Sequence, residues 1–296
     1  IVGIFATVLL GIIVTEIVRP KPLNWRPSYT QTDKIPFGCY VLYNELPHLF
    51  PSDDITDVTE SVYDFLVARD TTELSNYLLI NDYISLDKQE ANQLLDYVEQ
   101  GNDVFMAANS FGAYLSDTLN LEQDSRYQLR EDTLTASLTN RKFAPVEFHY
   151  AKGIHNSYFT SVDTFRTTVL GNLKFQSKSS LVGSKNENNA INGVNFIQVR
   201  FGKGNFYLNT LPEAFTNYYL LKGNQDYVAN TFSYLRDRPI YWDNYKKSGR
   251  MVITSPLRFV LNQPSLKWAY YLAILGLLIF MVFRAKREQR IIPVIE

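Results

Sequence analysis

Hydrophobic and polar residues between positions 77 and 108 follow a pattern that predicts a strand, a helix and a second strand. Tyr77–Asn81 and Val104–Ala108 are short apolar runs, as expected for strands buried on both faces. Between them, Leu86–Gln100 carries apolar residues at helical spacing, with Ser85 as its predicted N-cap. A strand–helix–strand unit of this length predicts two parallel strands joined by a right-handed crossover.

A different pattern follows, in which short strands alternate with polar linkers. Strands are expected at Leu134–Leu138, Val146–Tyr150, Thr168–Leu173 and Val194–Phe201. The last of these is expected to form a hairpin with Asn205–Asn209, because a glycine-rich turn separates the two runs. These segments predict antiparallel strands added to the parallel core. Ser177–Gly193, rich in Ser, Asn and Gly, is expected to be a loop.

Proline marks the limits of several other predicted elements. Pro20–Tyr29 contains three prolines and is expected to be an extended connection into the domain. A helix is expected to begin at Pro36 and to stop at Pro47. The remaining predicted elements are helices at Glu213–Leu221 and Gln225–Leu235 and a short edge strand at Pro239–Trp242.

Both ends of the chain carry long uncharged apolar runs. Ile1–Thr15 contains no charged residue, and neither does Trp268–Phe283. Since roughly 20 apolar residues cross a bilayer as a helix, we expect transmembrane helices at residues 1–18 and 265–284. A cytoplasmic leader before residue 1 would complete the first of them. A signal peptide and a buried core helix are the alternatives for the first run, but no small-x-small cleavage site follows it.

The residues that flank the second run predict its orientation. Aromatic side chains that favour the membrane interface lie at its start: Trp268, Tyr270 and Tyr271. Basic side chains crowd after its end: Arg284, Lys286, Arg287 and Arg290. Basic residues favour the cytoplasmic side, so both termini are expected in the cytoplasm, with residues 285–296 as a basic tail. Residues 19–264 would then form a domain outside the cytoplasmic membrane; in a Gram-negative cell this is the inner membrane and the domain is periplasmic. The tail would contact cytoplasmic machinery or anionic lipid, or would simply fix the topology.

Composition places the chain among folded proteins and excludes some function classes. Its 296 residues suffice for one large or two small domains, and 14% aromatic residues are typical of a packed core. A net charge of −1 argues against nucleic-acid binding, which usually needs a basic surface. The single cysteine, Cys39, excludes an intramolecular disulfide and any site built from several cysteines.

Ser110 is the strongest catalytic candidate, because it follows a predicted strand directly. Hydrolases of the α/β class place a nucleophilic serine at such a turn, within a Gly-x-Ser-x-Gly motif. Residue 108 is Ala, so the motif is incomplete, and Ser110 is better explained as the N-cap of the next helix. A serine hydrolase that uses Ser110 with His149 or His155 is kept as an alternative.

The other reactive residue types point to no defined reaction. Cys39 is expected in the first turn of a helix, where the dipole could lower its thiol pKa, but a buried apolar role is favoured. His48, His149 and His155 have no partner at metal-ligand spacing. Gly202-Lys203-Gly204 lacks the Walker spacing and is expected to be a plain turn. No catalytic, cofactor-binding or metal-binding residue is therefore assigned.

Several short motifs spread over the chain carry a family resemblance. They are Asn24–Tyr29, Pro36–Tyr40, Asn76–Ile80, Phe215–Tyr219, Tyr241–Asp243, Leu266–Tyr271 and Arg287–Pro293. On these motifs the chain resembles the domain of unknown function 4350 family of bacterial membrane proteins. The resemblance implies a single α/β sandwich domain similar to glutamine amidotransferases and flavodoxins. It also implies partner proteins, since family members are typically encoded beside a MoxR-type AAA+ ATPase and other membrane proteins.

The family resemblance also implies a protein without catalytic activity. A glutamine amidotransferase needs a cysteine at a strand-to-helix elbow, whereas Cys39 precedes the predicted strand–helix–strand unit and the elbow carries Ser110. We therefore expect a non-enzymatic, membrane-anchored subunit of an envelope complex. A periplasmic ligand-binding module is a second hypothesis. Its ligand would lie beyond the carboxyl ends of the strands, near Asn81–Tyr83 and Ala108–Phe111.

Overall fold

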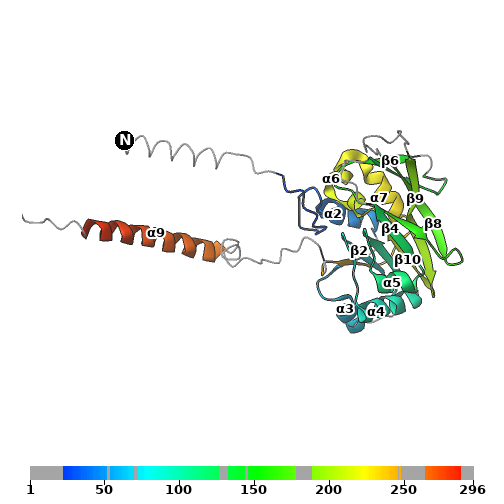
Figure 1. Ribbon diagram of the computed structural model, residues 1–296. Coiled ribbons are helices and arrows are strands. Elements are labelled where there is room, and N and C mark those ends of the chain that lie inside the picture. Colours follow the sequence, from blue (N-terminus) through cyan, green and yellow to red (C-terminus); the bar gives the residue numbers. More distant parts are fainter. Residues whose placement is uncertain are drawn as a thin grey trace, which may run out of the picture. The chain divides into compact units, whose positions relative to one another are not determined.

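The computed structural model describes residues 23–51, 54–69, 73–126, 133–143, 146–177, 189–245, 247 and 264–287. The chain divides into two compact units, one up to Arg250 and one from Met251. In the described residues, the second unit is helix α9 (Pro264–Arg287), and the first is an α/β domain around one large mixed sheet (Figure 1).

Five strands form the parallel half of the sheet. In spatial order they are β1 (Ile55–Val58), β11 (Ile240–Asp243), β2 (Asn76–Ile80), β3 (Asp103–Ala107) and β10 (Gly204–Asn209). Each pair of neighbours runs parallel. The predicted pairing of β2 with β3 across helix α4 (Lys88–Glu99) is therefore confirmed.

Antiparallel strands extend the sheet beyond β10, as the sequence predicts. In order they are β9 (Asn189–Phe201), β8 (Thr167–Ser177), β5 (Leu134–Leu138) and β6 (Glu147–Tyr150). The hairpin of β9 and β10 is confirmed. Two further strands, β4 (Glu122–Arg126) and β7 (Asn156–Ser161), pair with each other, and β7 also touches β9. The result is a mixed α/β domain with a sheet of 11 strands.

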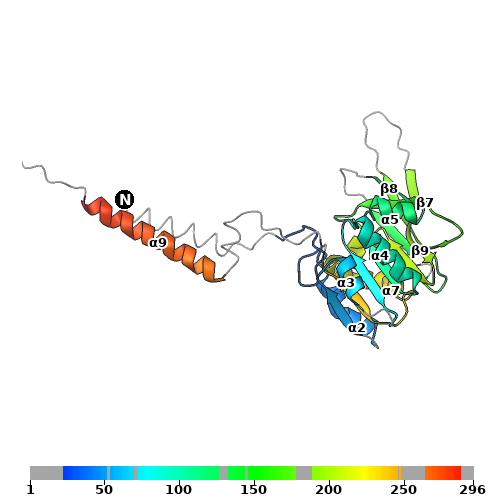
Figure 2. The same cartoon turned by 90° about the horizontal axis from the view of Figure 1, so that it is seen from below.

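Helices cover both faces of the parallel strands (Figures 1 and 2). One face packs against α2 (Tyr40–Leu49), α6 (Asn217–Tyr219) and α7 (Gln225–Phe232). The other packs against α3 (Val62–Ala68), α4 and α5 (Ala113–Thr118). Alternate residues of each strand supply the two cores. Leu78 and Phe105 enter the first core, and their neighbours Tyr77 and Val104 enter the second.

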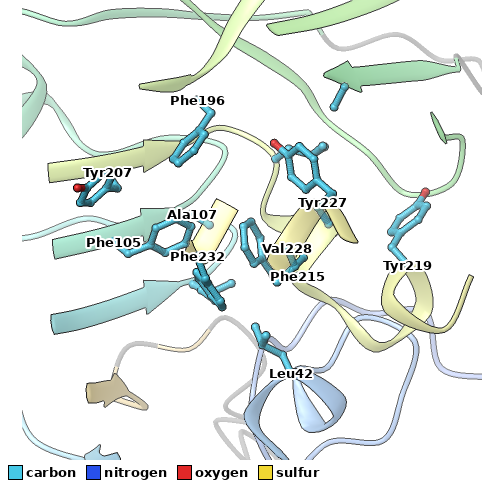
Figure 3. Close-up of a cluster of buried hydrophobic side chains, with 14 of the residues drawn as sticks. Leu42, Phe105, Ala107, Phe196, Tyr207, Phe215, Tyr219, Tyr227, Val228 and Phe232 are labelled. Atoms are coloured by element: carbon cyan, nitrogen blue, oxygen red, sulfur yellow. The ribbon is translucent and has the colours of Figure 1, made fainter. Parts of the chain in front are cut away.

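Aromatic rings dominate the first of the two cores, as Figure 3 shows. The ring of Phe105 lies 5.3 Å from that of Phe215 and 5.0 Å from that of Phe232, both in edge-on geometry. Phe232 comes from α7, and Phe215 from the short 3₁₀ helix η1 (Pro212–Phe215). Edge-on aromatic contacts add about 0.5–1.5 kcal/mol each beyond the burial of their area. The core therefore holds η1 and α7 firmly against the sheet.

Two helix caps differ from the prediction. Asp87, rather than Ser85, caps α4, because its carboxylate accepts hydrogen bonds from the backbone of Gln89 and Glu90. The Glu90 carboxylate in turn accepts a hydrogen bond from the backbone NH of Asp87, which completes a capping box. Gly112, rather than Ser110, precedes α5 with φ of 71°, a conformation that glycine tolerates best.

Other predicted boundaries are wrong because they depend on tertiary contacts. Pro47 lies inside α2, which continues to Leu49 with a bond from Phe50 N to Leu46 O. The helix predicted at Glu213–Leu221 is broken at Thr216, whose backbone is extended, and continues as α6 and then as the π-helix η2 (Leu220–Asn224). The predicted edge strand is β11, which lies inside the sheet between β1 and β2. Strand β9 begins at Asn189, within the predicted loop, while residues 178–188 lie outside the described residues.

The terminal segments are only partly covered by the described residues. Among the helices described, none combines the length and the apolar character that crossing a membrane requires. The helix predicted at residues 265–284 is present as α9, which has 24 residues, and its membrane crossing stays a prediction. Residues 1–18 lie outside the described part of the chain.

Candidate functional site at the carboxyl end of the parallel strands

The carboxyl ends of three parallel strands bring polar side chains together. Asp82 follows β2, Asn109 follows β3, and Glu213 lies in η1, just after β10. Asn109 Nδ2 donates to Asp82 Oδ1 over 2.8 Å and to Glu213 Oε1 over 3.2 Å. His155, just before β7, places Nδ1 3.0 Å from Glu213 Oε1. We call these four residues the carboxyl-end cluster.

The hydrogen bonds fix the proton on His155. The two amide protons of Asn109 are directed to the carboxylates of Asp82 and Glu213. His155 Nδ1 lies 3.1 Å from the same amide nitrogen, but no proton of that amide is left for it to accept. His155 Nδ1 therefore carries a proton, and this N–H donates a hydrogen bond to Glu213 Oε1. This hydrogen bond raises the pKa of His155 above its usual value, while partial burial acts in the opposite direction. The side chain of Glu213 is 1% exposed and that of His155 is 35% exposed, so the histidine is the solvent-facing member of the pair.

Several buried polar atoms at this end of the sheet lack a hydrogen-bond partner within the described residues. Among them are Glu213 Oε2, Asn109 Oδ1 and the hydroxyl of Tyr29. Tyr29 is fully buried, and burial together with the charges of Glu213 and Asp82 raises its pKa well above the usual value. Its phenol therefore stays protonated at any physiological pH. Buried polar groups are usually satisfied, so this combination marks a place where a polar group of another molecule would be stabilised.

Tyr29 is held in this position by hydrogen bonds within its own segment and from α6. We call residues 23–39 the strap. The backbone NH groups of Ser28 and Tyr29 both donate to Phe37 O over 3.0 Å, and Tyr29 has an unusual positive φ of 52°. Asn217 of α6 completes the attachment: its Nδ2 donates to the carbonyls of Asp33 and Ile35, each over 2.8 Å, and its Oδ1 accepts from Val41 N.

Cys39 and Lys247 are buried at the same end of the sheet. The Cys39 thiol lies 3.6 Å from Phe215 O, and burial raises its pKa to about 12. It is therefore a protonated, unreactive thiol at neutral pH, in agreement with the apolar role that the sequence favours. Lys247 Nζ donates to Ile80 O over 2.8 Å, and burial lowers the pKa of its ammonium, with Cys39 and Asp243 acting in the opposite direction.

The histidines do not complete a serine-hydrolase arrangement in the described part of the chain. His149 pairs with Thr135 Oγ1 over 3.1 Å, and His155 belongs to the carboxyl-end cluster. Ser110 is engaged through its backbone, where its carbonyl accepts from Ile84 N over 3.0 Å. Among the described residues, neither histidine is hydrogen-bonded to Ser110, and no group of three His, Cys, Asp or Glu side chains is placed to hold a metal ion.

The residues predicted to set topology lie in the second unit. Trp268 is 70% exposed and Tyr271 46% exposed, with the rings of Tyr270 and Tyr271 6.0 Å apart. Arg284, Lys286 and Arg287 belong to α9, and Arg290 lies outside the described residues. Their predicted roles at the membrane interface and in partner contact stay predictions.

Sequence reasoning located part of the carboxyl-end cluster and missed the rest. The rule that ligands lie beyond the carboxyl ends of parallel strands pointed to the segments that contain Asp82 and Asn109. Glu213 was missed because it was placed in the first turn of a regular helix. His155 and Tyr29 come from segments far away in sequence, and no local signal places them at this end of the sheet.

Comparison with known proteins identifies a family. A family model described as a domain of unknown function (DUF4350) matches residues 31–232. Comparison with curated proteins gives no match.

Solved structures give distant likenesses. The N-terminal domain of mmIFT52 is 12% identical over 71% of this chain and 93% of that domain, with a TM-score of 0.47. The exo-β-1,4-mannosidase Op5Man5 from Opitutaceae bacterium strain TAV5 is 13% identical, over 71% of this chain and 32% of that one, with a TM-score of 0.39. The α-L-fucosidase isoenzyme 2 from Paenibacillus thiaminolyticus is 14% identical over 62% of this chain and 32% of its own, with a TM-score of 0.37.

Proposed function

The chain belongs to the domain of unknown function 4350 family, and we propose that it is a non-enzymatic, membrane-anchored subunit of a bacterial envelope complex. In this proposal the complex works with a cytoplasmic MoxR-type AAA+ ATPase, the partner that the family resemblance implies. We further propose that the domain is a variant of the glutamine-amidotransferase and flavodoxin-like sandwich. Helices on both faces of the parallel strands support this variant.

The observation that supports the non-enzymatic role is that the side chains of the carboxyl-end cluster are hydrogen-bonded to one another. Asn109 is bonded to Asp82 and Glu213, and Glu213 is bonded to His155. These bonds join β2, β3, η1 and the segment before β7. A nucleophile needs an activating base or a lowered pKa, and the Cys39 thiol has a pKa raised to about 12. The arrangement therefore favours a framework that presents surfaces to partners.

The membrane-anchored part of the proposal rests on the sequence. Ile1–Thr15 and Trp268–Phe283 are uncharged, and the second run is followed by Arg284, Lys286, Arg287 and Arg290. In this proposal residues 1–18 and 265–284 cross the inner membrane and residues 19–264 are periplasmic. Each basic residue of the tail would contribute about 1 kcal/mol of attraction near an anionic lipid surface.

Purification of the intact protein from membranes tests the complex. We expect the protein to co-purify with other membrane proteins and with a MoxR-type ATPase. A variant with Arg284, Lys286, Arg287 and Arg290 changed to Gln should lose the ATPase if the tail is its contact. Recovery of the chain alone, under mild detergent conditions, would contradict the proposal.

A protease-protection assay on spheroplasts tests the topology. Residues 19–264 should be digested from the outside, and digestion from the cytoplasmic side alone would overturn the topology.

A ligand-binding module is the second candidate, and the unpartnered atoms of Glu213, Asn109 and Tyr29 favour it. Two of these atoms are acceptors, so the ligand class would be a small molecule with hydrogen-bond donors, such as a primary amine. Thermal unfolding with methylammonium, ethanolamine and glycinamide provides the test. A rise in melting temperature that Glu213→Gln abolishes would support binding. An unchanged melting temperature at millimolar concentrations would leave the cluster as a framework.

A further inference from the structure

Trp25 and Tyr218 form the centre of an exposed aromatic and basic surface on the domain. Their ring centroids are 5.1 Å apart in edge-on geometry, and both residues are half-buried. Lys152 Nζ lies 3.4 Å from the Trp25 ring centroid, and Lys222 Nζ lies 5.5 Å from that of Tyr218. Leu23 and Leu221 lie two and three residues from Trp25 and Tyr218 in the sequence and are 62% and 75% exposed. We call these six residues the strap face.

The strap face combines the two side-chain types that favour a lipid surface. Trp and Tyr prefer the depth of the lipid headgroups, because one end of each ring system is apolar and the other is polar. Lysine places its ammonium at the phosphates while its methylene stem covers apolar surface. The positions of Lys152 and Lys222 over aromatic rings hold both charges at one place on the surface. The exposed leucines add apolar area that water does not favour.

The charge of the strap face stands out against that of the chain. Residues 23–40, 151–154 and 218–223 contain four basic side chains, Arg26, Lys34, Lys152 and Lys222, and one acidic side chain, Asp33. The whole chain has a net charge of −1. A local excess of positive charge on a slightly acidic protein selects negatively charged surfaces.

Chain length places the strap face near the bilayer if the chain is anchored as proposed above, and the inference rests on that anchor. The predicted first span ends at residue 18, and Trp25 is seven residues further along. An extended chain covers at most about 3.6 Å per residue, so Trp25 lies within roughly 25 Å of the point where the chain leaves the membrane. A partner protein would have to compete with lipid that is already within reach.

We propose that the strap face docks the domain onto the anionic lipid headgroups of the membrane that anchors the chain. Lys152 and Lys222 bind lipid phosphates, and Trp25 and Tyr218 enter the headgroup layer between them. Docking holds the strap side of the domain against the bilayer and turns the opposite helices, α3 to α5, toward the other members of the complex.

Full-length protein in nanodiscs provides the test, with Trp25 as the probe. The chain has three tryptophans, of which Trp242 is fully buried, and Trp268→Phe removes the one in α9. We expect a headgroup spin-labelled lipid to quench Trp25 more in nanodiscs with phosphatidylglycerol than in nanodiscs of phosphatidylcholine alone. With about 1 kcal/mol per basic residue, the double variant Lys152→Gln/Lys222→Gln should lower the ratio of docked to undocked domains roughly 30-fold.

A matched control and four outcomes decide the inference. Lys88→Gln/Lys203→Gln removes the same charge from exposed lysines on α4 and on the β9–β10 turn, and should leave the quenching unchanged. Equal quenching in both lipids, or equal effects of the two double variants, would overturn the lipid contact. Quenching that changes only when an acidic partner protein is added would overturn it in favour of that partner. Failure of the chain to enter nanodiscs at all would instead sink the proposed anchor, so the two failures are distinguishable.

Discussion

The carboxylates of Asp103 and Glu213 are buried at opposite ends of the parallel strands, and their charges are balanced in different ways. At the amino end, Asp103 is fully buried and lies 3.7 Å from Arg236 Nε and 3.9 Å from Arg238 Nη1. At the carboxyl end, Glu213 lies 3.0 Å from His155 Nδ1. Arginine keeps its charge at any physiological pH, whereas histidine titrates near neutrality. The amino end therefore has constant charge balance, and the carboxyl end has a balance that depends on pH.

The two ends also differ in where their partners come from. Asp103 Oδ1 accepts from Asn205 N over 3.1 Å and from Asn205 Nδ2 over 2.9 Å, so its hydrogen bonds lie inside the sheet between β3 and β10. Glu213 depends on His155, which precedes β7, and is close to Tyr29 on the strap. Sites held by loops open more easily than sites held by paired strands. We therefore expect substitutions and ligands at the carboxyl end to change the local structure of the domain more easily than those at the amino end.

The largest effect is expected from Asp103→Ala. It removes the acceptor of the Asn205 backbone NH and leaves Arg238, which is 15% exposed, without its carboxylate. Loss of one partner of a buried pair costs about 3–5 kcal/mol of unfolding free energy. Urea unfolding should show this loss equally at pH 5.5 and pH 8.5. Asp96→Ala, on the exposed side of α4, is the control and should change stability by less than about 0.5 kcal/mol.

The next largest effect is expected from Asn217→Ala, which loosens the strap. The side chain makes three hydrogen bonds to the segment 33–41, and each contributes about 1 kcal/mol. We expect a loss of about 3 kcal/mol of unfolding free energy. We also expect faster labelling of Cys39 by a thiol reagent, because Cys39 belongs to the released segment. Asn92→Ala, which removes one surface hydrogen bond from Tyr114, should leave the labelling rate unchanged. Unaltered labelling in Asn217→Ala would show that the strap does not control access to Cys39.

The amino-acid pattern predicts the parallel core well because its signals are local. Strands β2 and β3 and helix α4 are within two residues of their predicted limits, and β5 has its predicted bounds. Strand β4 (Glu122–Arg126) was missed because all five residues are polar, and pairing with β7 makes it a strand. The interior position of β11 was missed because strand order is set by contacts far apart in sequence.

The carboxyl-end cluster follows the same division. Asp82 and Asn109 follow predicted strands, so their approach at one end of a parallel sheet is a local inference. Tyr29 reaches this end through the bonds of Asn217 to the strap, across more than 180 residues of sequence. Contacts between residues so far apart in the sequence depend on tertiary packing, and a local sequence pattern gives no information about them.

A smaller effect is expected from Glu213→Gln, which keeps the shape of the side chain and removes its charge. The hydrogen bond from His155 loses its negatively charged acceptor, at a cost of about 1–2 kcal/mol at pH 5.5. The pKa of His155 should fall, because the hydrogen bond that raises it is weakened. Proton NMR of the histidine ring measures this change directly. A His155 pKa that does not move in Glu213→Gln would contradict the assignment of Glu213 as its main partner.

The smallest effect is expected from His155→Gln, which tests whether the charge balance at the carboxyl end of the sheet depends on pH. The folded protein raises the pKa of His155 above its unfolded value near 6.5, so the stabilisation is complete below that pH. It is lost as the pH rises through the folded-state pKa. Because His155 is partly exposed, the cost of the variant should be about 1 kcal/mol at pH 5.5 and should fade by pH 8.5.

His149→Gln provides the control for this last prediction, since His149 is exposed and bonded to Thr135. Chemical unfolding of both variants at several pH values measures the cost of His155→Gln against that of His149→Gln, and the cost of His155→Gln should fall as the pH rises. A cost for His155→Gln that grows with pH would mean that the histidine is buried in its neutral form. The carboxyl end would then resemble the amino end, where charge balance does not respond to pH, and the difference between the two ends would disappear.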